Sequence, residues 1–197
     1  MKKLLKLSLA LAVIISLAPV ALATPVDFTP NVRGSSVVVT NYGSPLGGNV
    51  TANLALSGSP FTLQDNETQV LDFFTLSLSG ILAINDTYRI SATLSFIEPP
   101  IAGQATGGGT FSIFGIIRGG NLFWDDGTLP DYFTLDDGNV VRIDFENGVQ
   151  IGSGRTMVHA YVTNLGNAAS AVPEPLTIML LGLGLVGLAG AGRKFQK

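Results

Sequence analysis

Apolar and polar residues alternate with a period of two along much of the chain. In residues 88–96 every even position is apolar and every odd position is polar. The same alternation recurs in residues 74–79, 141–146 and 157–162. Successive side chains of a β-strand point to opposite faces, so this pattern predicts half-buried strands in antiparallel sheets. Further strand candidates are residues 36–41, 50–56, 110–118, 121–124 and 132–135.

Turn signals rich in glycine and proline separate the predicted strands. Asp126-Gly127, Asp137-Gly138 and Asn147-Gly148 are dipeptides that favour the tight turns of hairpins. Residues 98–109 are rich in proline at one end and glycine at the other, so they are expected to form a long exposed loop. No helical periodicity interrupts residues 24–170. Short strands at this spacing predict an all-β fold, an antiparallel β-sandwich with a jelly-roll-like order.

The N-terminal segment falls outside this pattern. Lys2, Lys3 and Lys6 precede an apolar run over residues 7–17, and the small residues Ala21 and Ala23 follow it. This order is typical of a secretory signal peptide, so residues 1–23 are expected to form a signal helix that is cleaved after Ala23. An uncleaved signal anchor is the alternative, which the shortness of the apolar run disfavours.

A second apolar segment, residues 176–192, lies near the C-terminus and contains 17 residues without a charge. As a transmembrane helix it would be about 26 Å long, enough to cross a thin bilayer. Arg193 and Lys194 follow directly. Cations resist translocation, so the basic end is expected in the cytoplasm and the rest of the chain outside. A buried core helix is the alternative, but the segment is apolar on every face.

The C-terminal tail contains three parts in a definite order. The sequence Val172-Pro173-Glu174-Pro175 comes first, the apolar segment follows, and Arg193-Lys194 stands close to the chain end. In order, spacing and position this tail resembles the PEP-CTERM sorting signal of exported bacterial proteins. The resemblance is confined to the tail and implies nothing about the fold of the preceding residues. A rigid spacer before an ordinary membrane anchor is the alternative for the two prolines.

The resemblance implies a route for the protein. After export by the Sec machinery, an exosortase, which is a membrane-embedded cysteine peptidase, is expected to cut near the Pro-Glu-Pro sequence. The body, residues 24–166, would then leave the inner membrane for the cell surface or a biofilm matrix, with exopolysaccharide as a candidate partner. Residues 167–172 are expected to be a linker, and residues 173–197 the sorting signal.

The charge of the body disfavours some partners. Residues 24–172 hold 13 acidic and 5 basic side chains, a net charge of −8. Nucleic-acid binding depends on neutralising phosphates with lysine and arginine, so nucleic acid is not an expected partner. The chain has no cysteine. It therefore has no disulfide, no thiolate nucleophile and no thiolate metal ligand.

Acidic residues gather in one segment of the body. It holds five carboxylates, those of Asp125, Asp126, Asp131, Asp136 and Asp137. Calcium takes about six to eight oxygen ligands, so this segment is a candidate calcium site, although the spacing is not that of an EF-hand. Two Asp-Asp-Gly turns joined by a strand are the simpler interpretation. No other cofactor is expected.

The remaining chemistry-bearing residues are isolated in the sequence. His159 is the only histidine, and without a second ligand or a nucleophile nearby it is assigned no catalytic or metal role. Trp124 is a candidate for stacking on a sugar ring, with core packing as the simpler interpretation. The sequence thus predicts a non-enzymatic exported protein. The alternative is a calcium-dependent carbohydrate-binding or carbohydrate-active domain that uses residues 125–137.

Overall fold

The computed structural model describes residues 25–42 and 47–167, and all the secondary-structure elements among these residues are β-strands. In chain order the strands are β1 (Val26–Pro30), β2 (Ser36–Asn41), β3 (Asn49–Leu54), β4 (Phe61–Leu63), β5 (Glu67–Ser79), β6 (Leu82–Glu98), β7 (Ala102–Phe114), β8 (Ile117–Trp124), β9 (Asp131–Thr134), β10 (Asn139–Phe145), β11 (Val149–Ile151) and β12 (Arg155–Asn167). The predicted turn glycines Gly127, Gly138 and Gly148 fall between strands and have positive φ angles.

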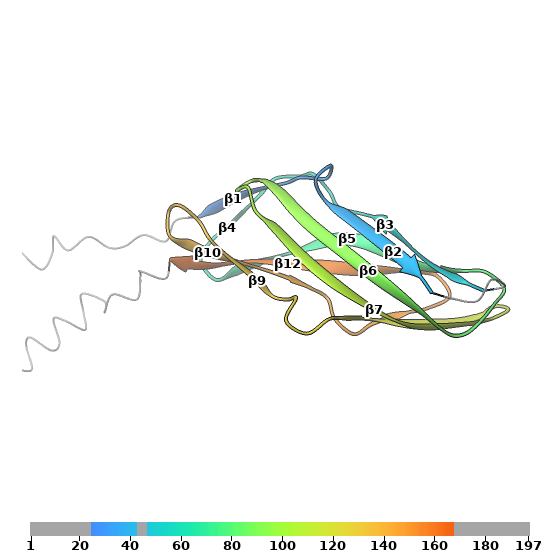
Figure 1. Cartoon of the computed structure of the whole chain (residues 1–197). Coiled ribbons are helices and arrows are strands. Elements are labelled where there is room, and N and C mark those ends of the chain that lie inside the picture. The colour runs from blue at the N-terminus through green and yellow to red at the C-terminus, as the bar shows by residue number, and fades with distance from the viewer. Residues whose placement is uncertain (1–24, 43–46, 168–197) are drawn as a thin grey trace, which may run out of the picture. The chain divides into compact units, whose positions relative to one another are not determined.

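The strands form two sheets, and neighbouring strands pair antiparallel throughout. The larger sheet has seven strands in the order β11-β8-β7-β6-β1-β4, with β2 also paired to β6. The smaller sheet has five, in the order β3-β5-β12-β10-β9. Figure 1 shows the long strands β6 and β7 of the larger sheet in front of β5 and β12 of the smaller one. The prediction of an all-β, antiparallel β-sandwich is confirmed.

The strand order combines a meander with repeated crossings between the two sheets. Strands β6, β7 and β8 follow one another in the sequence and also lie side by side in the larger sheet. They form a meander joined by short turns, whereas the chain before β6 and after β8 crosses repeatedly from one sheet to the other. The jelly-roll-like order stays a prediction, because alternation reports which face of a strand is buried and carries no information about the neighbouring strand.

One hydrophobic core lies between the sheets. The alternation in residues 88–96 is confirmed, since the five even positions are between 0% and 3% exposed. Val141, Ile143 and Val158 of the smaller sheet have no exposed surface. Burying one such large apolar side chain contributes about 1.5–3 kcal/mol. The alternating apolar faces therefore supply the main stabilisation of the sandwich.

Residues 98–109 contain the end of β6, the turn of the β6–β7 hairpin and more than half of β7, and so they do not form the predicted exposed loop. Only residues 99–101 lie outside the strands, and Gly107, Gly108 and Gly109 stand in the middle of β7. A Cβ atom on Gly108 would lie 2.2 Å from the carbonyl oxygen of Tyr88 in β6, and one on Gly109 would lie 2.0 Å from that of Asn121 in β8. These glycines allow three strands to approach closely, so they are not turn residues.

The β7–β8 turn interrupts a stretch that alternation predicts as one strand. Residues 110–118 contain the end of β7, a turn at Gly115 and Ile116, and the start of β8. Gly115 has a φ of 62°, which favours glycine. Because apolar residues flank the turn on both sides, the sequence pattern hides it.

A β-bulge shifts the register between β5 and β12. Val158 pairs with Phe74, whereas the next residue, His159, pairs with Asp72, so Phe73 is an additional residue in β5. Both phenylalanines are fully buried. On the far side of the bulge, Asp72 and His159 share the outer face of the smaller sheet.

Several predicted features lie outside the described residues. They are the signal peptide with Ala21 and Ala23, the linker beyond residue 167, the motif at residues 172–175, the apolar segment 176–192, and Arg193-Lys194. Within residues 25–42 and 47–167, no helix is long and apolar enough to cross a membrane.

Candidate functional site

Asp125, the first carboxylate of the acidic segment, is held by its neighbours. It follows β8 directly, and both of its carboxylate oxygens accept hydrogen bonds from the Arg89 guanidinium of β6. The Thr106 hydroxyl donates to the same carboxylate at 2.9 Å. These hydrogen bonds, that from Arg89 above all, hold the pKa of Asp125 below its usual value. Asp125 thus joins three strands of the larger sheet at the point where β8 ends.

The other carboxylates of the segment have separate surroundings. The Asp131 carboxylate accepts a hydrogen bond from the backbone N–H of Gln104 at 2.7 Å. Asp137 caps its own turn, accepting from the backbone amide and side-chain amide of Asn139 at 3.0 and 2.7 Å. Asp126 and Asp136 are exposed. The structure does not bring the five carboxylates to one point, and the described part of the chain contains no group of three or more acidic or histidine side chains placed to hold a metal ion.

Trp124 belongs to the core. Its side chain is only 7% exposed, and its indole N–H donates to the Glu146 carbonyl at 2.9 Å. The ring packs edge-on against Phe74 and tilted against Phe145. A ring held in this way does not present a face to a sugar. It lines a groove of about 450 Å³, whose other lining residues are Leu129, Pro130, Asp144, Phe145, Glu146, Asn147 and Tyr161.

His159 lies between two carboxylates on the outer face of the smaller sheet. Its Nδ1 is 2.7 Å from a Glu146 carboxylate oxygen, and its Nε2 is 3.4 Å from one of Asp72. The ring is about one-third exposed. The sequence does not reveal this cluster, because strand pairing and the β-bulge bring the three residues together. The one sequence feature that points to the cluster is the polar residue His159 at an outward position of its strand. The two carboxylates fix the orientation of the imidazole and link three neighbouring chain segments.

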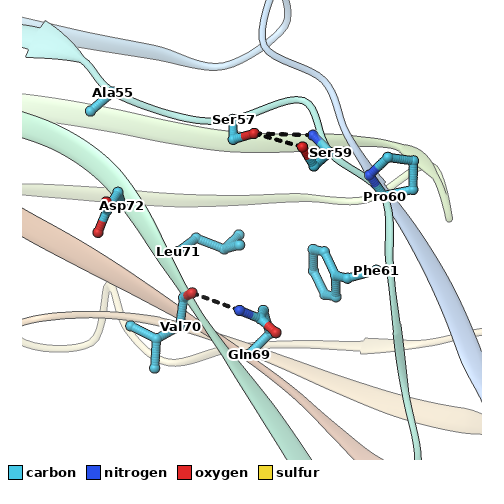
Figure 2. Close-up of a pocket in the computed structure, with 9 residues that line it drawn as sticks. All are labelled: Ala55, Ser57, Ser59, Pro60, Phe61, Gln69, Val70, Leu71 and Asp72. Atoms are coloured by element: carbon cyan, nitrogen blue, oxygen red, sulfur yellow. Dashed lines mark hydrogen bonds between the residues drawn. The ribbon is translucent and has the colours of Figure 1, made fainter.

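A second depression, of about 430 Å³, lies between residues 55–61 and residues 69–72 of β5. Figure 2 shows Leu71 and Phe61 pointing toward its middle, while the Ser57 and Ser59 hydroxyls hydrogen-bond to each other at 3.0 Å. Leu71 and Phe61 make its middle apolar, and the lining also includes the neutral polar Ser57, Ser59 and Gln69 and the acidic Asp72. It lacks the converging polar groups that usually orient a small ligand.

The described body is therefore an antiparallel β-sandwich in which Asp125, Asp144 and Glu146 pair with Arg89, Arg142 and His159 respectively. Comparison with known proteins adds one finding, at the C-terminal tail. Residues 171–194 match the family model for the PEP-CTERM protein-sorting motif. No curated protein and no solved structure matches the chain. The resemblance seen in Val172-Pro173-Glu174-Pro175 and Arg193-Lys194 is thereby confirmed. The motif implies an exported protein that is processed by an exosortase and sorted to the cell surface.

Proposed function

We propose that this chain is a non-enzymatic surface or matrix protein, a β-sandwich delivered by its sorting tail. The signal peptide directs export through the Sec machinery, and the C-terminal segment holds the chain transiently in the inner membrane with the body outside the cytoplasm. An exosortase then cuts near Pro173-Glu174-Pro175 and releases the body. The match of residues 171–194 to the sorting motif carries this proposal.

The chemistry of the tail fits this route. Pro173 and Pro175 lack the amide hydrogen that a helix requires, and residues before a proline avoid the α region. The backbone ahead of the apolar segment is therefore biased toward an extended form, which suits a peptidase cleft. Arg193 and Lys194 then resist passage through the bilayer. The peptide would thus be presented at the outer boundary of the membrane.

The contacts of the body support a role without catalysis. In the described residues the charged side chains of Asp125, Asp144 and Glu146 are each paired, with Arg89, Arg142 and His159 respectively. The Arg89–Asp125 and His159–Glu146 pairs link separate chain segments, whereas Arg142 and Asp144 both lie in β10. The alternative, a calcium-dependent carbohydrate-binding domain at residues 125–137, is less favoured, because the five carboxylates have separate surroundings. Exopolysaccharide stays a candidate partner of the released body.

The mature C-terminus tests the proposal. The full chain is expressed in a host that contains an exosortase, and the exported form is analysed by mass spectrometry. We expect a protein that begins at residue 24 and ends near the motif, without residues 176–197. The triple variant Pro173→Ala/Glu174→Ala/Pro175→Ala should retain the tail and stay in the membrane fraction. The linker variant Ser170→Ala serves as the matched control. Retention of the tail in the exported parent protein would exclude release by cleavage.

A further inference from the structure

One end of the larger sheet carries a concentration of exposed apolar side chains. We call the apolar end the six residues Ile81, Leu82, Ile84, Phe114, Ile116 and Ile117, which come from the β5–β6 turn, the β7–β8 turn and the adjoining strand ends. They are six of the fourteen exposed large apolar residues in the described part of the chain, and Ile116 is 91% exposed. Single exposed apolar residues are common, but a cluster of this kind marks an interaction surface.

The apolar end reverses the pattern of the rest of the sheet. Leu82 pairs with Phe114, and Phe114 pairs with Ile117, so these three side chains form a row across β6, β7 and β8. Farther along β7, the outward positions hold Thr110 and Ser112. Along β7 the outward positions are thus polar except at this end, whereas exposed apolar residues elsewhere on the larger sheet, such as Val38 of β2 and Phe123 of β8, lie on separate strands. Packing inside the described sandwich does not account for the change.

An uncovered strand edge adjoins the same row. Strand β11 pairs with β8 only from Gly120 to Leu122. The preceding residues, Ile117 to Gly119, pair with β7 on one side and with no strand of the described residues on the other. Exposed edges of this kind are usually protected by charges or prolines, because they invite another strand.

The only charged residue of this edge does not protect it. The Arg118 guanidinium points away from the outer face and donates to the carbonyl oxygens of Leu78 and Gly80, at 2.6 and 3.3 Å. Its hydrogen bonds join the two sheets at this end. Gly119 has no atom within 4 Å of the position that a Cβ would take. The edge therefore presents a free backbone and an open space beside Ile117.

The free backbone distinguishes between two possible occupants. A lipid bilayer would accept the apolar side chains, but its hydrocarbon offers no partner for the unpaired N–H and C=O groups of the edge. A second β-strand satisfies both features at once. The body also carries a net charge of −8, which disfavours anionic membrane surfaces. Residues 79–86 and 112–119 themselves contain one acidic residue, Asp86, and one basic residue, Arg118, so this end is locally neutral.

We propose that the apolar end binds the apolar end of a second copy of this chain, by antiparallel pairing of the two β8 edges. The two-fold axis passes beside Arg118, so that Ile117 of each copy lies opposite Gly119 of the other. Paired residues of an antiparallel ladder share a face, and Gly119 leaves room for the isoleucine. The contact is self-complementary and closed, as a two-fold dimer requires.

The position of the apolar end is compatible with the tail. Arg155, at the start of β12, pairs with Ser77 near this end, and β12 then runs 13 residues to Asn167. At about 3.3 Å per residue the tail begins roughly 40 Å away along the strand. The proposed contact thus lies far along β12 from Asn167, the last described residue, and the proposal does not depend on whether an exosortase removes the tail.

Site-directed cross-linking tests the proposed register, and the absence of native cysteine makes the test specific. In the exported full chain, the double variant Ile117→Cys/Gly119→Cys places two thiols on facing positions of the two copies. We expect oxidation to give a covalent dimer. The control Val38→Cys/Thr40→Cys has the same spacing on β2, also exposed and at a sheet edge, and should stay monomeric. Equal cross-linking of the two variants would overturn the proposal.

A charge substitution tests the same interface without cysteine. The detergent-solubilised full chain should sediment with twice the monomer mass. Ile117→Lys should raise the dissociation constant of the dimer by roughly 100-fold or more, because two unpaired ammonium groups would be buried. Val38→Lys is the matched control and should leave the dimer intact. A monomeric parent protein, or a dimer that persists in Ile117→Lys, would refute the contact. A lipid-binding result would also refute the contact. It would consist of failed cross-linking together with a shift to shorter wavelength in the emission of a fluorophore attached to Ile116→Cys when phosphatidylcholine vesicles are added, and it would assign the apolar end to lipid.

Discussion

The glycines of β7 and β8 give the sharpest test of how this sheet is packed. Gly108 and Gly119 both stand inside strands of the larger sheet, and neither has a positive φ. They differ in the space around the missing side chain. A Cβ on Gly108 would lie 2.2 Å from the Tyr88 carbonyl oxygen, whereas a Cβ on Gly119 would meet nothing within 4 Å. The variants Gly108→Ala and Gly119→Ala therefore add the same methyl group to two different environments.

The expected effects have opposite signs. In Gly108→Ala the obstacle is backbone, which cannot rotate away, so β6 and β7 must separate locally. Overpacking of this kind costs about 1–3 kcal/mol, and each ladder hydrogen bond that lengthens costs about 1 kcal/mol more. We therefore expect the free energy of unfolding to fall by about 2–4 kcal/mol. In Gly119→Ala the alanine restricts only the unfolded chain, so stability should rise by about 0.4–1 kcal/mol.

Urea denaturation followed by tryptophan fluorescence measures both effects. Trp124 is the only tryptophan and is 7% exposed in the core, so its emission reports unfolding of the sandwich. The full chain is measured in detergent at low protein concentration, where self-association does not add to stability. If the two variants had the same midpoint, the close approach of β6 and β7 at Gly108 would be wrong, and residues 107–109 would be better described as a loop.

Other features of the structure lead to further predictions. Tyr88→Phe should lower the free energy of unfolding by about 1 kcal/mol, measured by urea denaturation, because the hydroxyl that donates to the Asn121 carbonyl at 2.7 Å is lost; an unchanged midpoint would contradict that hydrogen bond. The pKa of Asp125 is lowered in the folded state, so the contribution of this carboxylate to stability is present above the unfolded-state pKa and is lost as the pH falls through the folded-state pKa. Asp125→Asn should therefore flatten the acid side of the profile of unfolding free energy against pH. A profile identical to that of the parent protein would argue against the Arg89–Asp125 pair. Calcium should leave the melting temperature of the chain unchanged relative to chelator, whereas a rise would revive a metal site at residues 125–137. Added salt should strengthen the proposed dimer in sedimentation, because it screens the net charge of −8 that residues 24–172 of each copy carry; weakening by salt would indicate an ionic contact.

The sequence determined the strands of the core and the nature of the tail. Alternation places Tyr88, Ile90 and Leu94 on one face whatever the neighbouring strand, since the period of two is a property of the extended backbone itself. The sorting motif is likewise linear, because a run of prolines, apolar residues and cations has the same meaning wherever the body lies. Asp-Gly and Asn-Gly turns are equally local.

The tertiary structure alone decided how these strands meet. Gly107 to Gly109 look like a turn in the sequence, and only the distances to β6 and β8 reveal that they allow close strand approach. Asp72, Glu146 and His159 come from three segments, and a β-bulge sets the register that joins them. The acidic residues 125–137 seem a single cluster by position, yet turn geometry gives each a different partner. Strand pairing and register depend on contacts between residues far apart in the chain, and no local pattern encodes those contacts.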